Sequence, residues 1–521
     1  MRQLLSLLPV LGLALVGCAV EPEGPVSPDD EAAMDADLTS VSALSRKLTF
    51  QGVVHVRDGA TDSEILSVVR KQTQSAFGAL RTANVGVNSR ELKDVDPATF
   101  VKTKVQVVDG TTVTTMLRVQ YTYTDNAVAP KSMARRTSLS LALLGKDYSS
   151  QSARILTECT DNDAEARDFA SSLWYVFNPS LSGCKTAIAA ERKKIAADRA
   201  KLAAGQIPKS EVDRLYLPIT VRLGADQTNK GNSYPEYDRL YSGGVKKDTL
   251  VISLVNGILD HEHKELADDS GYSEWMETLR EVFAVRPGLQ LAAIEPAEDF
   301  KSVTVGGKTY SNIAFTDVMK WTIDGTGFPA GMPTTLRHDA QVAMAKKLSR
   351  HWLTFRAPLQ VKIGANAVKT VTLELTTYFG AESDPAPHKR AIKNSDVFVY
   401  NGHSYIGYGP LDPSRFSASD FPSSYQILFI DGCVSYNYYE KDYLPLKPGA
   451  TRNLELITNG LEAPSWRSGW ALGRFLGKLV DGSQASYRDL LSAASATDSL
   501  RVVDGEVDNL YSPTKTPITV K

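Results

Sequence analysis

Short, nearly continuous apolar segments constrain the second half of this chain more than any other feature. They cover residues 249–255, 371–375, 396–400, 425–430 and 453–457. Helix-like segments lie among and after them, at 388–394 and 469–480. Strands that are apolar on both faces are typical of a mostly parallel sheet covered by helices. We therefore expect an α/β domain over residues 213–521, with ligand chemistry at the carboxyl ends of its strands.

The first half of the chain has a different pattern. Apolar residues alternate over 47–57, and Thr61 and Glu64 form a capping box before a helical pattern. A hairpin is expected over 99–123, turning at Asp109-Gly110. These features predict a small α+β domain over 47–150. Residues 151–212 then read as a helical hairpin that is broken at Asn178-Pro179.

The first residues resemble an export signal. A basic start, Met1-Arg2-Gln3, precedes an apolar run that is too short to span a bilayer. The sequence Leu15-Val16-Gly17-Cys18 resembles the lipobox of bacterial lipoproteins. That resemblance implies a signal peptide over 1–17 and lipidation of Cys18. Ala19 resembles the residue found in lipoproteins sent to an outer membrane, if the host has one.

Residues 18–46 are acidic and rich in proline, so we expect a tether that holds the protein at the bacterial cell envelope. No second apolar run of 18 residues follows, which predicts a lipid-anchored protein rather than one that spans the membrane. The chain has 58 Lys and Arg against 60 Asp and Glu, a net charge of −2. A nucleic-acid binder usually has a strong basic excess, so we do not expect nucleic acid as a partner.

The cysteines divide into a pair and a single thiol. Besides Cys18, the chain contains Cys159, Cys184 and Cys433. Disulfides survive in the oxidising compartments that exported proteins reach. Cys159 and Cys184 lie close together around a helical stretch, so they are the expected pair, and Cys433 is expected to be free.

Two of the predicted strands end in residues that can carry chemistry. The strand at 396–400 runs into Asn401-Gly402-His403-Ser404, and the strand at 425–430 runs into Asp431-Gly432-Cys433. If these strands are parallel neighbours, His403 and Cys433 emerge at the same edge of the sheet. A thiol beside an imidazole is the minimal arrangement of a cysteine nucleophile. Backbone N–H groups at such turns can stabilise an oxyanion.

This pair of motifs resembles the caspase-like cysteine peptidases, and within them the gingipain-type enzymes most. The resemblance covers roughly residues 215–500. It implies that His403 is the catalytic histidine and Cys433 the nucleophile, with the N–H groups of Ser404 and Cys433 as the oxyanion hole. It also implies a peptide or protein substrate and no cofactor.

The same resemblance suggests which residues border the substrate pocket. The candidates are Asn256, Gly257, Asn459, Gly460 and Glu462. The family usually has glycine directly after the histidine, where this chain has Ser404. A serine with positive φ at that position would carry a strain of about 1–2 kcal/mol.

Two alternatives remain open. A catalytically inactive lipoprotein could keep this fold as a binding or structural module. A zinc hydrolase could use Asp260, His261 and His263, although the run lacks the His-Glu-x-x-His spacing and lies among charged residues. A solvated surface turn is the simpler interpretation of that run, and we expect no metal. Gly-x-Ser-x-Gly is absent, which argues against a serine hydrolase.

Overall fold

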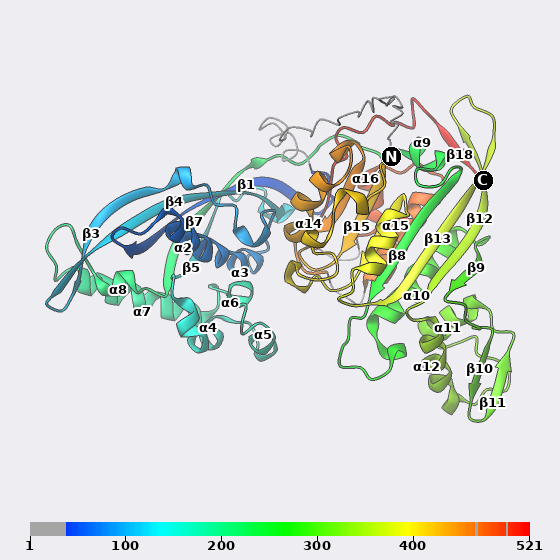
Figure 1. The fold of residues 1–521 in the computed structure, drawn as a ribbon, viewed down its shortest axis with the longest axis horizontal. Helices are drawn as coiled ribbons and strands as arrows, with labels where there is room; N and C mark the ends of the chain where they lie inside the picture. The colour runs from blue at the N-terminus through cyan, green and yellow to red at the C-terminus, as the bar shows by residue number, and fades with distance from the viewer. Residues whose placement is uncertain (1–37, 464–466, 496–498) are drawn as a thin grey trace, which may run out of the picture.

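The computed structural model describes residues 38–463, 467–495 and 499–521, which form two lobes side by side (Figure 1). We call residues 38–226 the N-terminal lobe and residues 227–521 the C-terminal lobe. The predicted signal peptide, the lipidation site Cys18 and most of the predicted tether lie outside the described residues. In the described ranges, no helix has the length and apolar character needed to cross a bilayer.

The N-terminal lobe is built on a largely antiparallel sheet with the order β5-β7-β1-β4-β3-β6, and β2 pairs with β4. Its strands are β1 (Ala43–Arg57), β2 (Gly86–Val87), β3 (Val101–Asp109), β4 (Thr112–Pro130), β5 (Ser138–Leu144), β6 (Gln206–Pro208) and β7 (Tyr216–Asp226). The predicted hairpin at Asp109-Gly110 is present as β3 and β4. The capping box of Thr61 and Glu64 begins the first helix of the lobe.

The helices of this lobe are α2 (Asp62–Gln74), α3 (Ala76–Arg81), α4 (Ser152–Cys159), α5 (Asp163–Asp168), α6 (Leu173–Val176), α7 (Ser182–Arg199) and α8 (Lys209–Val212). The expected helical hairpin is therefore a series of short helices followed by the long α7. The predicted disulfide between Cys159 and Cys184 is present and joins the end of α4 to the start of α7. Cys433 is free.

The N-terminal lobe begins earlier and ends later in the chain than the predicted domain boundaries. Strand β1 begins at Ala43, within the predicted tether, and Thr39 already pairs with Val503. Strand β7, which we assigned to the α/β domain, pairs with β5 and β1. Its buried and exposed residues alternate from Ile219 to Leu223, as in an antiparallel strand with one solvated face.

The C-terminal lobe contains a mixed sheet with the order β17-β16-β15-β14-β8-β13-β12-β18, and β9 pairs with β12. The strands are β8 (Thr249–Gly257), β9 (Gln290–Glu295), β12 (Trp352–Ile363), β13 (Lys369–Ala381), β14 (Val397–Asn401), β15 (Gln426–Asp431), β16 (Leu454–Asn459), β17 (Arg501–Asp504) and β18 (Ile518–Val520). The strands expected from the apolar segments are parallel neighbours at its centre.

Our expectation of a mostly parallel sheet is corrected at both edges. Strand β17 is antiparallel to β16, and β12 is antiparallel to β13, β9 and β18. The reason lies in the pattern of β12, where buried and exposed residues alternate, as they do in antiparallel strands with one solvated face. A separate hairpin, β10 (Ser302–Val305) and β11 (Lys308–Ser311), turns at Gly306-Gly307.

Both faces of the central strands are covered. In β14, Val397 and Val399 belong to one core cluster, while Phe398 and Tyr400 belong to another. The first cluster packs under α10 (Ser270–Val285), α11 (Phe315–Asp324), α12 (Arg337–Leu348), α15 (Ser468–Val480) and α16 (Tyr487–Ala493), with α9 (Tyr237–Ser242) at its edge. The second packs under α13 (Ala386–Lys393), α14 (Ser435–Tyr443) and the N-terminal lobe. This two-sided burial explains why the strands read as continuous apolar runs.

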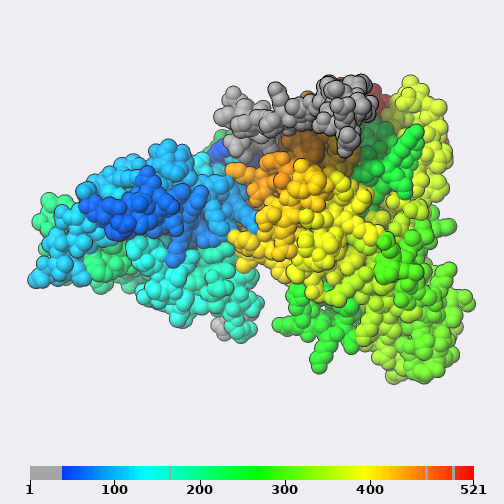
Figure 2. Space-filling view, in the orientation of Figure 1, coloured from blue at the N-terminus to red at the C-terminus, as the bar shows by residue number. Residues whose placement is uncertain are grey.

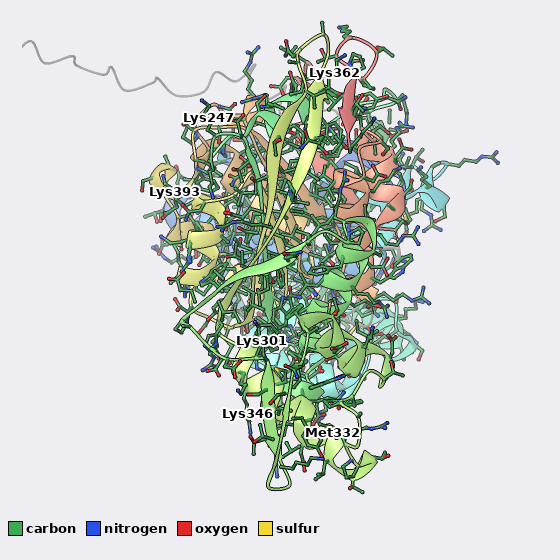
Figure 3. All side chains as sticks on the ribbon, turned by 90° about the vertical axis from the view of Figure 1, so that its right-hand side faces the viewer. Lys247, Lys301, Met332, Lys346, Lys362 and Lys393 are labelled. Atoms are coloured by element: carbon green, nitrogen blue, oxygen red, sulfur yellow. A yellow bond between two sulfur atoms is a disulfide. The ribbon has the colours of Figure 1, made fainter. Side chains whose placement is uncertain are left out.

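The two lobes share one apolar core rather than meeting at a polar boundary. The second cluster runs without a break from Phe77 and Tyr175 in the N-terminal lobe to Tyr438 and Leu456 in the C-terminal lobe. The buried side chain of Asn437 donates to the carbonyl oxygens of Val87 (3.1 Å) and Ser89 (2.7 Å) across the junction. The exposed end of the C-terminal lobe carries lysines spread along its whole length, among them Lys247, Lys346 and Lys393 (Figure 3).

Candidate active site

His403 and Cys433 follow the ends of two adjacent parallel strands. Strand β14 pairs with β15 in a register that places Asn401 opposite Asp431. His403 and Cys433 each lie two residues beyond that pair. The topology therefore brings the two residues to the same edge of the sheet, where ligand sites of α/β sheets collect.

Two cavities meet at this pair of residues, and both are lined by His403 and Cys433. The larger has a volume of about 530 Å³ and reaches toward the N-terminal lobe. The smaller has a volume of about 200 Å³ and lies over the strand ends, against Asn401 and Asp431. Figure 2 shows that the surface is hollowed between the lobes, where the helical segment near residue 170 faces the loop near residue 260. His403 and Cys433 therefore face the same two cavities.

The imidazole of His403 is held in one orientation. Its Nε2 lies 2.8 Å from the carbonyl oxygen of Leu259. A carbonyl oxygen can only accept, so Nε2 carries the proton and Nδ1 is left as the acceptor in the neutral ring. The hydroxyl of Tyr400 donates to the carbonyl oxygen of His403 at 2.9 Å, and the ring of His261 stacks on the His403 ring with centroids 5.4 Å apart. His403 is thus prepared to accept a proton through Nδ1.

The thiol of Cys433 lies in a less favourable environment for ionisation. It is half-buried, and its Sγ lies 3.9 Å from the carbonyl oxygen of Ala463. Burial, with smaller contributions from the carboxylates of Glu462 and Asp431, raises the pKa of the Cys433 thiol to about 11. The thiol is therefore protonated at neutral pH, and its use as a nucleophile requires a base.

Ser404 adopts an ordinary backbone conformation. Its φ is −80°, so the strain considered for a serine at this position does not arise. The positive φ values fall instead on Tyr405 (50°) and Ile406 (53°). Among the described residues, the amide N–H groups of Ser404 and Cys433 have no hydrogen-bond acceptor. The Ser404 hydroxyl is buried and also lacks a partner there. These donors are available to an oxyanion.

A row of buried polar side chains lies below the pair. Asp431 accepts hydrogen bonds from Arg501 (2.7 Å) and Asn459 (2.6 Å), and Arg501 also donates to the Asn459 side chain (3.0 Å). Asn401 donates to Glu274 on α10 at 2.5 Å. Burial raises the pKa of Glu274 to about 9, so this carboxyl is neutral at pH 7. The network fixes the strand ends from which His403 and Cys433 project.

None of the five expected pocket residues lines either cavity in the described part of the chain. Asn256 is fully buried, and its side-chain atoms have no partner in that part. Gly257 packs near Ala381 and Gly402, and Asn459 belongs to the polar row. Gly460 contacts the N-terminal lobe, and Glu462 pairs with Arg81 of that lobe. The residues that do line the cavities include several that the sequence pattern did not reveal.

The missed residues come from outside the strand-end motifs. Phe169 and Tyr175 of the N-terminal lobe and His261 of the loop after β8 line the larger cavity. Asp168 lines it too. His261 was visible only as part of a charged run, and nothing in the local sequence indicates that residues near 170 reach a site more than 200 residues away. Such contacts depend on how the lobes pack.

The zinc alternative finds no support in the geometry. In the ranges that the structure covers, no three His, Cys, Asp or Glu side chains are grouped to hold a metal ion. Asp260 accepts the N–H of Ser270 at 2.7 Å and lies 3.9 Å from Nε2 of His263. His261 points to the His403 ring instead, as its stacking contact shows.

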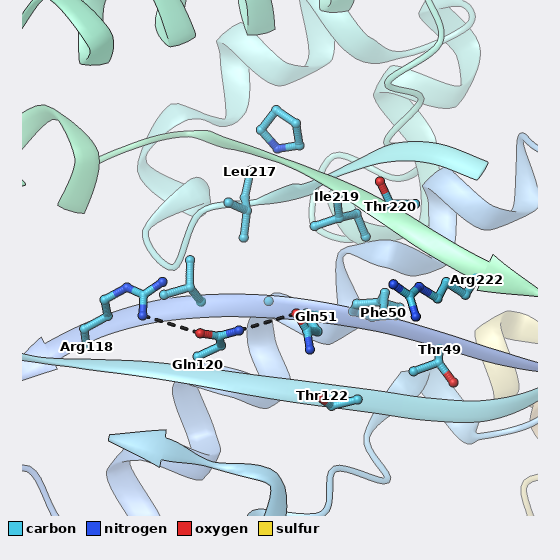
Figure 4. A pocket seen from close by; sticks show the side chains of 13 residues that line it. Thr49, Phe50, Gln51, Arg118, Gln120, Thr122, Leu217, Ile219, Thr220 and Arg222 are labelled. Carbon is cyan, nitrogen blue, oxygen red and sulfur yellow. Dashed lines mark hydrogen bonds between the residues drawn. The ribbon is translucent and has the colours of Figure 1, made fainter. Parts of the chain in front are cut away.

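A further groove of about 500 Å³ lies on the sheet of the N-terminal lobe, between β1, β4 and β7 (Figure 4). Gln120 accepts from Arg118 at 3.5 Å and donates to Gln51 at 3.4 Å across its floor. The groove contains no thiol, imidazole or carboxylate. Among the described residues, His403 and Cys433 line the two cavities at the junction of the lobes and do not line this groove.

Comparisons with family models, with curated proteins and with solved structures gave no match to this chain.

Proposed function

We propose that the protein is a cysteine endopeptidase of the bacterial cell envelope, anchored through a lipid on Cys18. The observation that carries the proposal is the placement of His403 and Cys433 on adjacent parallel strand ends, both lining the same two cavities. The fixed Nε2 proton of His403 and the available amides of Ser404 and Cys433 support it.

The proposed reaction follows from these groups. Nδ1 of His403 takes the thiol proton as Sγ of Cys433 attacks the carbonyl carbon of the substrate. The amides of Ser404 and Cys433 donate to the oxygen that becomes negative. His403 returns the proton to the leaving amine, and a thioester remains on Cys433. Water then attacks the thioester with His403 as base, which releases the acid and restores the thiol.

The test compares three variants on an unfolded protein substrate. We expect Cys433→Ala to abolish hydrolysis and His403→Ala to cost nearly as much, because members of one catalytic unit are not additive. His338→Ala is the matched control, because this exposed histidine pairs with Asp268 at 2.8 Å and lines neither cavity. Full activity of Cys433→Ala would exclude the proposal.

A second candidate is a binding module without catalysis. The raised pKa of the Cys433 thiol, caused by burial, favours it, because catalytic cysteines usually have a lowered pKa. Under this alternative, purified wild-type protein hydrolyses no peptide, and a peptide binds with the same affinity to wild type and to Cys433→Ala.

The anchor is tested separately. We expect Cys18→Ser to move the protein from the membrane fraction to the soluble fraction, because the described residues contain no spanning helix. Membrane fractionation with and without detergent measures this. Unchanged membrane retention of the variant would argue against lipidation at Cys18.

A further inference from the structure

The larger cavity beside Cys433 is built jointly by the two lobes. Its walls are mostly aromatic or aliphatic, from Phe169 and Tyr175 of the N-terminal lobe and Tyr405, Ile406 and Tyr438 of the C-terminal lobe. At about 530 Å³ it lies within the range of typical ligand pockets, about 300–1,000 Å³. It opens directly onto the thiol and the imidazole.

The N-terminal wall is held by several packing contacts. The Tyr175 ring stacks on Phe169 with centroids 4.7 Å apart and on Phe77 at 5.5 Å. The guanidinium of Arg81 lies 4.7 Å from the Tyr175 ring centroid, and the Tyr175 hydroxyl donates to Glu462 at 3.4 Å. Such a packed wall binds a side chain without first having to be ordered.

The charges beside this wall compensate each other. Arg81 of the N-terminal lobe pairs with Glu462 of the C-terminal lobe. Glu462 lies outside the lining, and the carboxylate in the described lining belongs to Asp168, which is exposed. A charged substrate side chain would lose its hydration in the cavity, and an exposed carboxylate such as that of Asp168 compensates little for this loss.

The C-terminal wall is held in a strained backbone. Tyr405 and Ile406 both have positive φ although neither is glycine, which is an unfavourable backbone conformation for such residues. The strain places two large apolar side chains in the cavity directly after Ser404. Strained positions of this kind concentrate at ligand sites.

We propose that this cavity binds a large apolar side chain of the substrate, preferably aromatic, next to the bond that Cys433 attacks. The inference rests on the proposed endopeptidase function for the position of the scissile bond. Stacked aromatic pairs contribute beyond the apolar area that they bury, which favours an aromatic occupant. The N-terminal lobe is then part of the substrate-binding site, since Phe169 and Tyr175 belong to the walls.

The first experiment compares peptides that differ at one position only, with Phe, Ala, Glu or Lys. We expect kcat/KM of the wild type for the Phe peptide to exceed the other three by on the order of tenfold or more. Phe169→Ala and Ile406→Ala should lower kcat/KM for the Phe peptide by a larger factor than for the Ala peptide. Leu510→Ala is the control, because this exposed apolar residue does not line the cavity. Thermal unfolding checks that each variant is folded.

Two results would contradict the proposal that the cavity binds a large apolar side chain. One is a preference for the Glu or Lys peptide. The other is a rise in turnover in Phe169→Ala, which would identify the N-terminal segment as an obstacle rather than a wall.

The second experiment separates the pocket from the catalysis. Titration calorimetry measures the binding of the Phe and Ala peptides to Cys433→Ala, which cannot hydrolyse them. One outcome supports the pocket and excludes the endopeptidase function. In this case the wild type hydrolyses no peptide, Cys433→Ala binds the Phe peptide, and Phe169→Ala weakens that binding. If wild type hydrolyses peptides but Cys433→Ala does not prefer the Phe peptide, the function stands and the pocket falls.

Discussion

At the scale of single residues, the site depends on two glycines that neighbouring side chains approach closely. A Cβ atom on Gly402 would lie 2.4 Å from the hydroxyl oxygen of Tyr400 and 2.7 Å from its ring. A Cβ on Gly432 would lie 2.4 Å from the Ser404 hydroxyl. Glycine therefore directly precedes His403 and Cys433 because space for a side chain is lacking, not because φ is positive.

The first prediction concerns Gly402→Ala. The added methyl must displace the Tyr400 ring, whose hydroxyl positions the His403 carbonyl. We expect a loss of about 1–3 kcal/mol in the free energy of unfolding, together with a marked loss of peptidase activity. Urea unfolding and peptide hydrolysis measure the two effects.

The control is Gly288→Ala, where a Cβ would meet no atom within 4 Å. Wild-type stability and activity in Gly402→Ala would mean that the Tyr400 ring moves freely and does not position His403.

The second prediction concerns the pH dependence of the Cys433 thiol. Because burial raises its pKa to about 11, the thiolate fraction increases with pH over the whole neutral and mildly alkaline range. We expect the rate of alkylation by iodoacetamide to rise about tenfold per pH unit up to about pH 10, as the thiolate is the nucleophile. Mass spectrometry of the Cys433 peptide measures the rate. A plateau below pH 8 would show instead that the thiolate is already paired with protonated His403.

At the scale of elements, helix α10 is joined to strand β14 by a buried carboxyl. Glu274 is 3% exposed and accepts one hydrogen bond from Asn401. The unfolded chain releases the Glu274 proton above its ordinary pKa of 4.5, whereas burial raises the pKa in the folded protein to about 9. The unfolded state therefore binds fewer protons between these pH values, and the free energy of unfolding falls as pH rises from about 4.5 to about 9.

The third prediction follows from this decrease of the free energy of unfolding with rising pH. Glu274→Gln keeps an acceptor for Asn401 and removes the titration. We expect the variant to lose less stability than wild type between pH 5 and pH 9, measured by urea unfolding at several pH values. Glu382→Gln, which removes an exposed carboxylate paired with Arg350, is the control. Parallel pH profiles for wild type and Glu274→Gln would contradict the prediction.

The elements also show how far the sequence predicts this protein. The central strands, the hairpin at Asp109-Gly110 and the disulfide were all predicted, because apolar runs, turn residues and cysteine spacing are local signals. The sequence did not predict the antiparallel strands at the edges of the C-terminal sheet. The apolar runs of its central strands indicated burial on both faces, and we extended this interpretation to the whole C-terminal half.

The candidate site was predictable only in part. His403 and Cys433 lie at strand ends in sequence, so a local pattern revealed them. Arg501 of the polar row and Phe169 of the cavity wall reach the site through tertiary packing, which no local pattern encodes.

At the scale of the whole molecule, the lobes meet backbone against backbone. A Cβ on Gly86 of the N-terminal lobe would lie 2.4 Å from the carbonyl oxygen of Gly460, and a Cβ on Gly460 would lie 2.4 Å from Val128. Around this contact, Asn88 donates to Glu440 at 3.0 Å. The lobes are therefore in close backbone contact at this point of the interface.

The fourth prediction is that the lobes unfold together. We expect a single calorimetric transition for wild type, because one core cluster spans both lobes. Gly86→Ala should lower the temperature of that one transition and reduce activity, since the interface also forms the cavity wall. Two transitions, with only one shifted by Gly86→Ala, would show that the lobes are independent.

The pairing of Thr39 with Val503 has a consequence for how the chain is made. Their backbones exchange two hydrogen bonds of 3.1 and 2.9 Å, and the Ser40 hydroxyl donates to the Arg501 carbonyl, 461 residues later, at 2.6 Å. A ribosome or an export channel delivers residue 39 long before residue 503. The first residues of the fold therefore lack their pairing partner until residue 503 has been delivered, and such long-range contacts slow folding. A nascent chain of this protein must remain protected from aggregation at least until that point.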